Sequence, residues 1–171
     1  KHAAPLQDAQ RAMGLIRQHA QEWGIDPKRV GVVGFSAGGH LSAMVSTVPD
    51  RTYPKVDSAD ELSSLPNFAV LIYPGYLVQD NQGETIAREI KITSATPETF
   101  IAMTADDPVR AENALAYALA LKKEKVPVEL HLYPSGGHGY GLRKTDNPLT
   151  RWDERLEEWL KWRGFTRTSG H

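Results

Sequence analysis

Residues 34–38 form the pattern Gly-x-Ser-x-Gly, with Ser36 at its centre. A short apolar stretch precedes the pattern and a helix-forming stretch follows it, so we expect a sharp turn from a strand into a helix. Such a turn holds its central residue in a strained backbone conformation, and glycines on either side let neighbouring chain approach. The Ser36 hydroxyl would then stand clear of the sheet as a nucleophile. The backbone N–H of Ala37 would point to where an oxyanion forms.

Two other interpretations of this pattern lead to different chemistry. A glycine-rich turn with a capping serine would have the same composition, since such pentapeptides also occur by chance. A phosphate-binding loop is disfavoured, because no Gly-Lys-Ser or Gly-Lys-Thr follows and residues 34–39 do not form Gly-x-Gly-x-x-Gly. The nucleophile interpretation therefore depends on a base and an acid elsewhere in the chain.

A serine hydroxyl is a poor nucleophile unless a base accepts its proton and an acid orients that base. His138 lies in a glycine-rich loop after a predicted strand and is the candidate base. Asp106 and Asp107 directly follow the preceding predicted strand. The chain order serine, aspartate, histidine, with the last two in loops after later strands, is the one that accompanies a Gly-x-Ser-x-Gly turn between a strand and a helix. We therefore predict a catalytic triad.

The choice between the two aspartates depends on where the next helix starts. Asp107 precedes Pro108, and Asp at the N-cap with Pro at the first helical position is typical of a helix start. This interpretation assigns Asp107 to capping and predicts Asp106 as the catalytic acid. His40 and His131 are competing bases, but the first lies one turn into a helix and the second lies within a strand.

Strands and helices are expected to alternate along the chain. Continuous apolar runs predict buried strands, and apolar residues at spacings of three and four predict helices. The strands are expected at residues 29–34, 68–73, 99–104 and 128–133, and the helices at residues 6–23, 37–48, 109–123 and from Trp152 onward. Between them lie a polar loop and a mixed segment, 76–97, with a helical stretch near 84–89. This order predicts the α/β class: one domain over residues 1–171, with a mostly parallel sheet and helices on both faces.

The composition is that of an ordinary globular domain, with 40% hydrophobic and 24% charged residues. The 20 basic and 21 acidic residues show no basic cluster, which argues against a nucleic-acid partner. No apolar run is long enough to cross a membrane, and residues 1–5 do not resemble a signal peptide. Without cysteine there are no disulfides or thiolate metal sites, no metal-ligand spacing is found, and the predicted triad needs no cofactor.

The motifs resemble a known family. Three parts of the chain carry the resemblance. The first runs from Pro5 through residues 23–27 to residues 33–41, the second is residues 106–109 with Glu112, Asn113 and Tyr117, and the third is residues 136–141. They are similar to bacterial esterases related to acetylxylan esterase and feruloyl esterase, which have the α/β-hydrolase fold. In the related prolyl-oligopeptidase branch the acid is the first Asp of an Asp-Asp-x-Val run, which also favours Asp106. The resemblance implies a serine carboxylesterase that removes short acyl groups from xylan-like carbohydrate, in the periplasm or outside the cell.

One departure from that family concerns the start of the chain. The family's enzymes begin with further strands and a His-Gly-Gly-type loop that supplies a second oxyanion donor, and the 171 residues contain neither. The resemblance therefore implies the C-terminal catalytic part of a longer enzyme, without its N-terminal strands. The strand at residues 30–34 is then left at an edge, where an apolar strand tends to pair with another chain. We expect self-association through this edge.

Two other functions stay open on the sequence. A serine peptidase of the prolyl-oligopeptidase type would use the same triad, although no site for a charged amine or a proline is identifiable. A non-catalytic fragment or assembly module would keep the motifs without turnover. The patterns do not distinguish between acyl lengths or between sugars.

Overall fold

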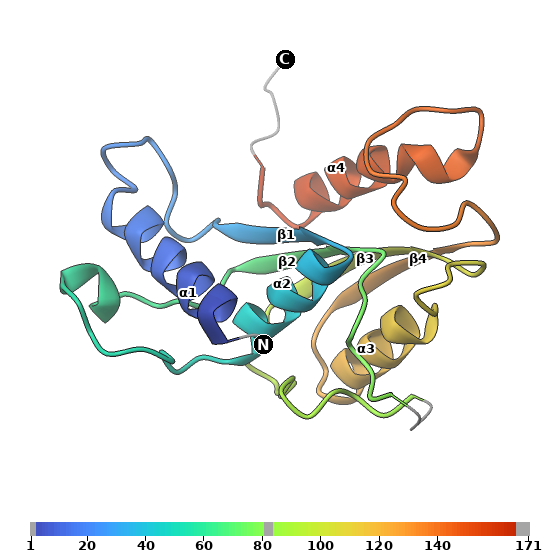
Figure 1. Ribbon diagram of the computed structural model, residues 1–171. Helices are drawn as coiled ribbons and strands as arrows, with labels where there is room; N and C mark the ends of the chain where they lie inside the picture. Colours follow the sequence, from blue (N-terminus) through green and yellow to red (C-terminus); the bar gives the residue numbers. More distant parts are fainter. Residues whose placement is uncertain (1–2, 81–83, 167–171) are drawn as a thin grey trace, which may run out of the picture.

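A four-stranded parallel sheet forms the centre of the structure, in the order β1-β2-β3-β4 (Figure 1). The computed structural model describes residues 3–80 and 84–166. The strands are β1 (Gly31–Phe35), β2 (Phe68–Ile72), β3 (Glu98–Thr104) and β4 (Val128–Tyr133). The helices are α1 (Ala3–Gln18), α2 (Ala37–Thr47), α3 (Glu112–Lys123) and α4 (Trp152–Trp162), with short 3-10 helices η1 (Ser58–Glu61) and η2 (Pro148–Arg151).

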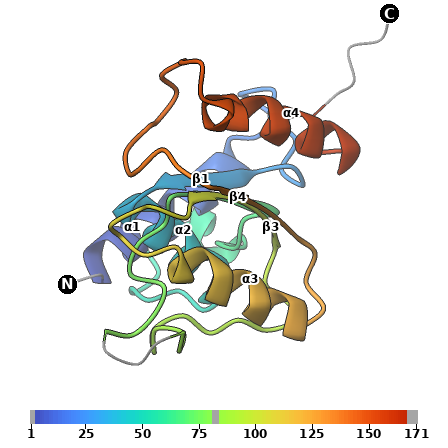
Figure 2. The same cartoon turned by 90° about the vertical axis from the view of Figure 1, so that its right-hand side faces the viewer.

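Helices cover both faces of this sheet. α2 packs on β1 and β2, α3 packs on β3 and β4, and α1 packs against α2. α4 lies on the opposite face, above the sheet in Figures 1 and 2. The arrangement confirms the predicted α/β class, because each parallel strand is connected to the next across a face of the sheet.

The two central strands form the core. Leu71, Ile72, Phe100, Ile101 and Met103 are fully buried, since these strands have neighbours on both sides and helices on both faces. Burying each such side chain stabilises the fold by about 1.5–3 kcal/mol. This rigid centre determines where the carboxyl ends of the strands, and therefore the loops that follow them, are placed.

Two predicted helical stretches differ in the structure. α3 begins at Glu112, three residues after the predicted start at residue 109. The predicted helical stretch around residues 84–89 is wrong for its described residues: Val78 and Ile86 form an antiparallel bridge there. The backbone N–H of Gln79 donates to the carbonyl of Thr85 at 2.8 Å, so residues 76–80 and 84–89 lie side by side. We call these two segments the strap.

β1 and β4 lie at the two edges of the sheet. The edge position of β4 agrees with its alternating pattern of apolar and polar residues. Within the described ranges, β1 pairs with β2 alone, and the side chain of Val33 is 55% exposed. An apolar edge strand of this kind is a site for pairing with another chain.

We predict that the 171-residue chain self-associates through β1. Replacing Val33 by Lys should weaken the association several-fold in sedimentation equilibrium, because a charge on an edge strand opposes its pairing with another chain. Val56→Lys is the matched control, since it places the same charge on a side chain that is 70% exposed in the loop before η1. Equal association of the two variants would count against the β1 edge as the contact.

Candidate active site

Ser36 lies in the sharp turn between β1 and α2, as the sequence predicts. Its backbone has φ 55° and ψ −119°, a left-handed conformation that is costly for a residue other than glycine. Three backbone hydrogen bonds hold the turn in place. The Ser36 N–H donates to the Ile72 carbonyl at 3.0 Å, and the Ser36 carbonyl accepts from Gly39 at 2.9 Å and from Gly75 at 3.2 Å.

Close packing explains two of the glycines around this turn. A Cβ on Gly34 would lie 2.0 Å from the Gly38 carbonyl oxygen, and one on Gly39 would lie 2.8 Å from the Cβ of Pro74. The expectation that glycines on both sides of Ser36 admit neighbouring chain is therefore correct for Gly34. At Gly38 a Cβ would meet no described atom within 4 Å, and Gly39 provides the close approach instead.

His138 connects the serine to an aspartate. Its Nε2 lies 2.8 Å from the Oγ of Ser36, and its Nδ1 lies 2.8 Å from Oδ2 and 3.0 Å from Oδ1 of Asp107. The Asp107 side chain is fully buried, and that of His138 is 25% exposed. Ser36 follows β1, Asp107 follows β3 and His138 follows β4, so all three groups meet at the carboxyl ends of parallel strands. This is the geometry of a nucleophile, a base and an orienting acid.

The expectation that Asp106 contacts the histidine is wrong, because Asp107 is the aspartate that lies against the His138 ring. The capping contact expected of Asp107 is present, because its Oδ1 accepts a hydrogen bond from the Val109 N–H at 2.7 Å. That contact closes a turn before α3, which begins only at Glu112. A carboxylate has two oxygens and about four acceptor positions, so the same group also reaches His138. Capping and orienting the histidine are therefore not alternatives.

Asp106 instead holds the backbone of the histidine loop. Its carboxylate accepts hydrogen bonds from the N–H groups of Gly137 at 2.9 Å and Gly136 at 3.2 Å. These N–H groups, first that of Gly137, lower the pKa of Asp106 below its ordinary value. Thr104 adds a third contact by donating its hydroxyl to the Gly137 carbonyl at 2.8 Å. Gly136 and Gly137 have φ of 145° and 63°, where a side chain would be strained.

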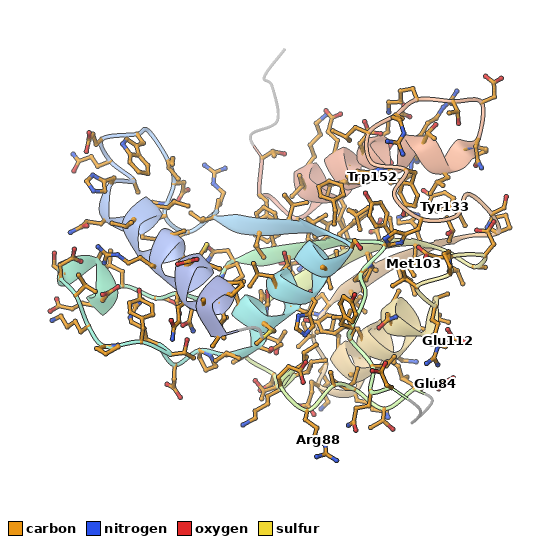
Figure 3. All side chains as sticks on the ribbon, in the orientation of Figure 1. Glu84, Arg88, Met103, Glu112, Tyr133 and Trp152 are labelled. Carbon is orange, nitrogen blue, oxygen red and sulfur yellow. The ribbon has the colours of Figure 1, made fainter. Side chains whose placement is uncertain are left out.

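Aromatic side chains pack against the histidine and its loop. The ring of Tyr73 packs edge-on against His138, with 4.8 Å between the ring centroids, and Tyr140 packs against Tyr73 at 4.5 Å. Burial raises the pKa of both phenols, which keeps them neutral beside the imidazole. Trp152, labelled in Figure 3, donates its ring N–H to the Gly141 carbonyl at 2.8 Å. The only sequence signal for Tyr73 is its place at the end of a predicted buried strand.

Asn113 is a second residue whose role the sequence does not reveal. Its Oδ1 accepts from the backbone N–H groups of Leu77 at 2.7 Å and Val78 at 3.2 Å. Its Nδ2 donates to the carbonyls of Val109 at 2.6 Å and Arg110 at 3.0 Å. One buried amide thus ties the segment after β2 to the loop that carries Asp107. The resemblance pointed to Asn113 without assigning it a contact.

The competing histidines are placed elsewhere. His40 is buried one turn into α2, and its Nε2 lies 3.1 Å from Oε1 of Glu89. His131 lies in β4, 2.8 Å from Glu129. His138 is therefore the histidine that contacts the Ser36 hydroxyl.

Ala37 is the first residue of α2, directly beside the nucleophile. Its N–H has no acceptor within the helix, because the first N–H groups of any helix lack an intrahelical partner. A partial positive charge at this helix end also favours a developing anion. The Ala37 N–H is therefore a candidate for one of the donors that stabilise an oxyanion.

Two classes of site receive no support from the described residues. In residues 3–80 and 84–166, no group of three or more His, Cys, Asp or Glu side chains is placed to hold a metal ion. Over the same ranges, no helix has both the length and the apolar character needed to cross a bilayer.

Comparison with solved structures identifies the family. The acetyl ester-xyloside bifunctional hydrolase from Caldicellulosiruptor lactoaceticus is 37% identical, with a TM-score of 0.87 over 98% of this chain and 68% of that one. The chain belongs to the α/β-hydrolase family of esterases. A thermophilic esterase from Thermogutta terrifontis matches this α/β-hydrolase at 30% identity and a TM-score of 0.82, over 99% of this chain and 69% of that one. The resemblance inferred from the motifs is thereby confirmed.

Sequence relatives of this α/β-hydrolase agree with the structural ones. Residues 1–72 match the family model described as BD-FAE. The acetylxylan esterase of Xylanibacter ruminicola and the endo-1,4-beta-xylanase B of Butyrivibrio fibrisolvens are each 29% identical, over 92% and 81% of this chain. The matched region spans only 35% and 25% of those two relatives, respectively.

Proposed function

We propose that this chain is a serine carboxylesterase that hydrolyses short acyl esters through Ser36, His138 and Asp107. The supporting observation is the pair of short contacts made by one imidazole, 2.8 Å to the Ser36 hydroxyl and 2.8 Å to the Asp107 carboxylate. An acetylated, xylan-like carbohydrate is the proposed substrate, because an acetylxylan esterase and an acetyl ester-xyloside hydrolase are among the relatives.

The first half of the reaction forms an acyl-enzyme. Ser36 Oγ attacks the ester carbonyl carbon while Nε2 of His138 accepts the hydroxyl proton. The carbonyl oxygen becomes an anion beside the Ala37 N–H, and the Asp107 carboxylate stabilises the imidazolium. When the tetrahedral intermediate collapses, the bond to the alcohol breaks and His138 returns the proton to the leaving oxygen.

The second half releases the acid. Water takes the place of the alcohol, and His138 accepts a proton from it as its oxygen attacks the acyl carbon. A second tetrahedral intermediate forms at the same place and collapses to break the bond to Ser36 Oγ, which regains the proton from His138. The ester is thereby converted into a carboxylic acid and an alcohol, and no metal or redox step is required.

Substrate assays test this proposal. We expect the chain to hydrolyse p-nitrophenyl acetate and to release acetate from acetylated xylan, with much lower rates on longer acyl esters and on prolyl anilides. A fluorophosphonate probe should label Ser36, because it reacts with an activated serine. Acetate release no greater than that of Ser36→Ala would contradict the esterase proposal, and faster cleavage of prolyl anilides would favour the peptidase interpretation.

A further inference from the structure

A cavity of about 360 Å³ lies along the strap that follows β2. One aromatic ring, Tyr76, and four polar or charged side chains line most of it: Gln79, Asp80, Arg88 and Glu89. Figure 3 shows Arg88 extending from this strap toward solvent at the lower margin of the molecule. The volume is in the range of sites for small organic molecules, which are typically about 300–1,000 Å³.

The inner wall of this cavity rests on the helix that carries the nucleophile. The N–H of Gly75 donates to the carbonyl of Ser36 at 3.2 Å, and Tyr76 is the next residue along the chain. His40, one turn into α2, packs edge-on against the Tyr76 ring with 6.2 Å between centroids and contacts Glu89 at 3.1 Å. Because His40 is buried, it fixes two walls of the cavity relative to the active site.

The exposure of Tyr76 is not explained by packing. Its backbone has φ 60°, a left-handed conformation that is unfavourable for a bulky residue. Its side chain is nevertheless 63% exposed, so burial of the ring contributes little in return. The hydrogen bond from the Leu77 N–H to Asn113 helps to hold the strap in this conformation. The result is an aromatic ring presented to solvent from an anchored backbone.

The chemistry of the lining matches a sugar. A pyranose has an apolar face of C–H groups that can stack on an aromatic ring, and hydroxyl groups around its rim that donate and accept hydrogen bonds. Carboxylates such as Asp80 and Glu89 accept from hydroxyls, whereas the Arg88 guanidinium donates to them. A simple acyl chain would instead need an apolar lining.

We propose that this cavity is a sugar subsite that holds the carbohydrate part of the ester, with Tyr76 as its stacking platform. This inference rests on the proposed esterase function and names the part of the substrate that is bound beside Ser36. The acyl group reacts at Ser36 while the sugar lies along the strap. Small esters without a sugar would bypass this contact.

Variants at Tyr76 test the proposal on two substrates. Tyr76→Ala should lower kcat/KM on an acetylated xylo-oligosaccharide roughly tenfold, chiefly through KM, because the stacking surface is lost. Its kcat/KM on p-nitrophenyl acetate should stay within about twofold of the parent chain. Tyr76→Phe should behave as the parent on both substrates, since it keeps the ring. Trp162→Ala is the matched control, because it removes another exposed aromatic ring. Trp162 lies in α4, which covers the face of the sheet opposite α2 and α3.

Binding of the deacetylated oligosaccharide separates this proposal from the esterase proposal. An NMR titration should show binding to the parent and to Tyr76→Phe, and about tenfold weaker binding to Tyr76→Ala. This result would support the subsite even if the chain did not turn over esters. Absence of binding to the parent, or equal losses of activity on both substrates in Tyr76→Ala, would overturn the proposal.

Discussion

Replacement of Ser36 by Ala is expected to lower kcat for p-nitrophenyl acetate by about 10⁵–10⁶-fold, because nucleophile and base act as one unit. The fold should be retained, since Ser36 holds the turn through its backbone N–H and carbonyl rather than through its hydroxyl. Initial rates, circular dichroism and thermal unfolding of the parent and the variant would measure both effects.

Ser58→Ala is the matched control for this substitution. Ser58 lies in η1, where its hydroxyl accepts a hydrogen bond from Gln18 at 2.8 Å, away from the site. This variant should keep its activity and its labelling by a fluorophosphonate probe, whereas Ser36→Ala should lose both. Activity of Ser36→Ala within tenfold of the parent would remove Ser36 from the mechanism.

Asp107→Asn is expected to lower kcat by about 10³–10⁴-fold with little change in KM. The amide nitrogen of Asn would donate to Nδ1 of His138 and place the ring proton on Nε2. In that tautomer the imidazole cannot accept the proton of Ser36. The amide oxygen can still accept from the Val109 N–H, so the turn before α3 should be kept. Steady-state kinetics with a check of thermal stability would test this expectation.

Asp106→Asn provides the comparison that decides between the two aspartates. Gly136 and Gly137 donate to different carboxylate oxygens of Asp106, and the substitution turns one of these oxygens into an NH2 group, so the histidine loop loses one anchor. We expect a loss of activity of about tenfold or less, because no group in contact with the His138 ring changes. If Asp106→Asn were the more damaging of the two, the acid predicted from the sequence would be the right one.

The parts of the site that depend on local pattern could be predicted from the sequence. The nucleophile elbow is a strand, a turn and a helix that are contiguous in the chain, so Ser36 and Ala37 are recognisable from their neighbours. His138 is recognisable because it stands in a glycine-rich loop after a strand. The apolar runs of β2 and β3 predict buried central strands for the same reason, since both faces of each strand must be covered.

The acid could not be chosen from local pattern. Asp106 and Asp107 are adjacent, and both face the loop that follows β4. One binds the His138 ring and the other binds the N–H groups of Gly136 and Gly137. The direction of each side chain depends on the backbone of the turn before α3 and on a loop 30 residues later. A capping rule considers only the turn before α3 and not the later loop. It also assumes one partner for the carboxylate, whose two oxygens can bind two different groups.

Residues that support the site from other elements were also beyond local inference. Tyr73 directly follows β2, and its ring packs against that of His138. Asn113 binds the N–H groups of Leu77 and Val78, which lie 35 or more residues earlier, and so joins the strap to the loop that carries Asp107. The sequence by itself therefore determined the class of fold and the positions of the candidate nucleophile and the candidate base, because their signals are contiguous in the chain. The tertiary structure decided which aspartate faces the histidine and which side chains hold the loops, because those contacts exist only after distant strands have been placed side by side.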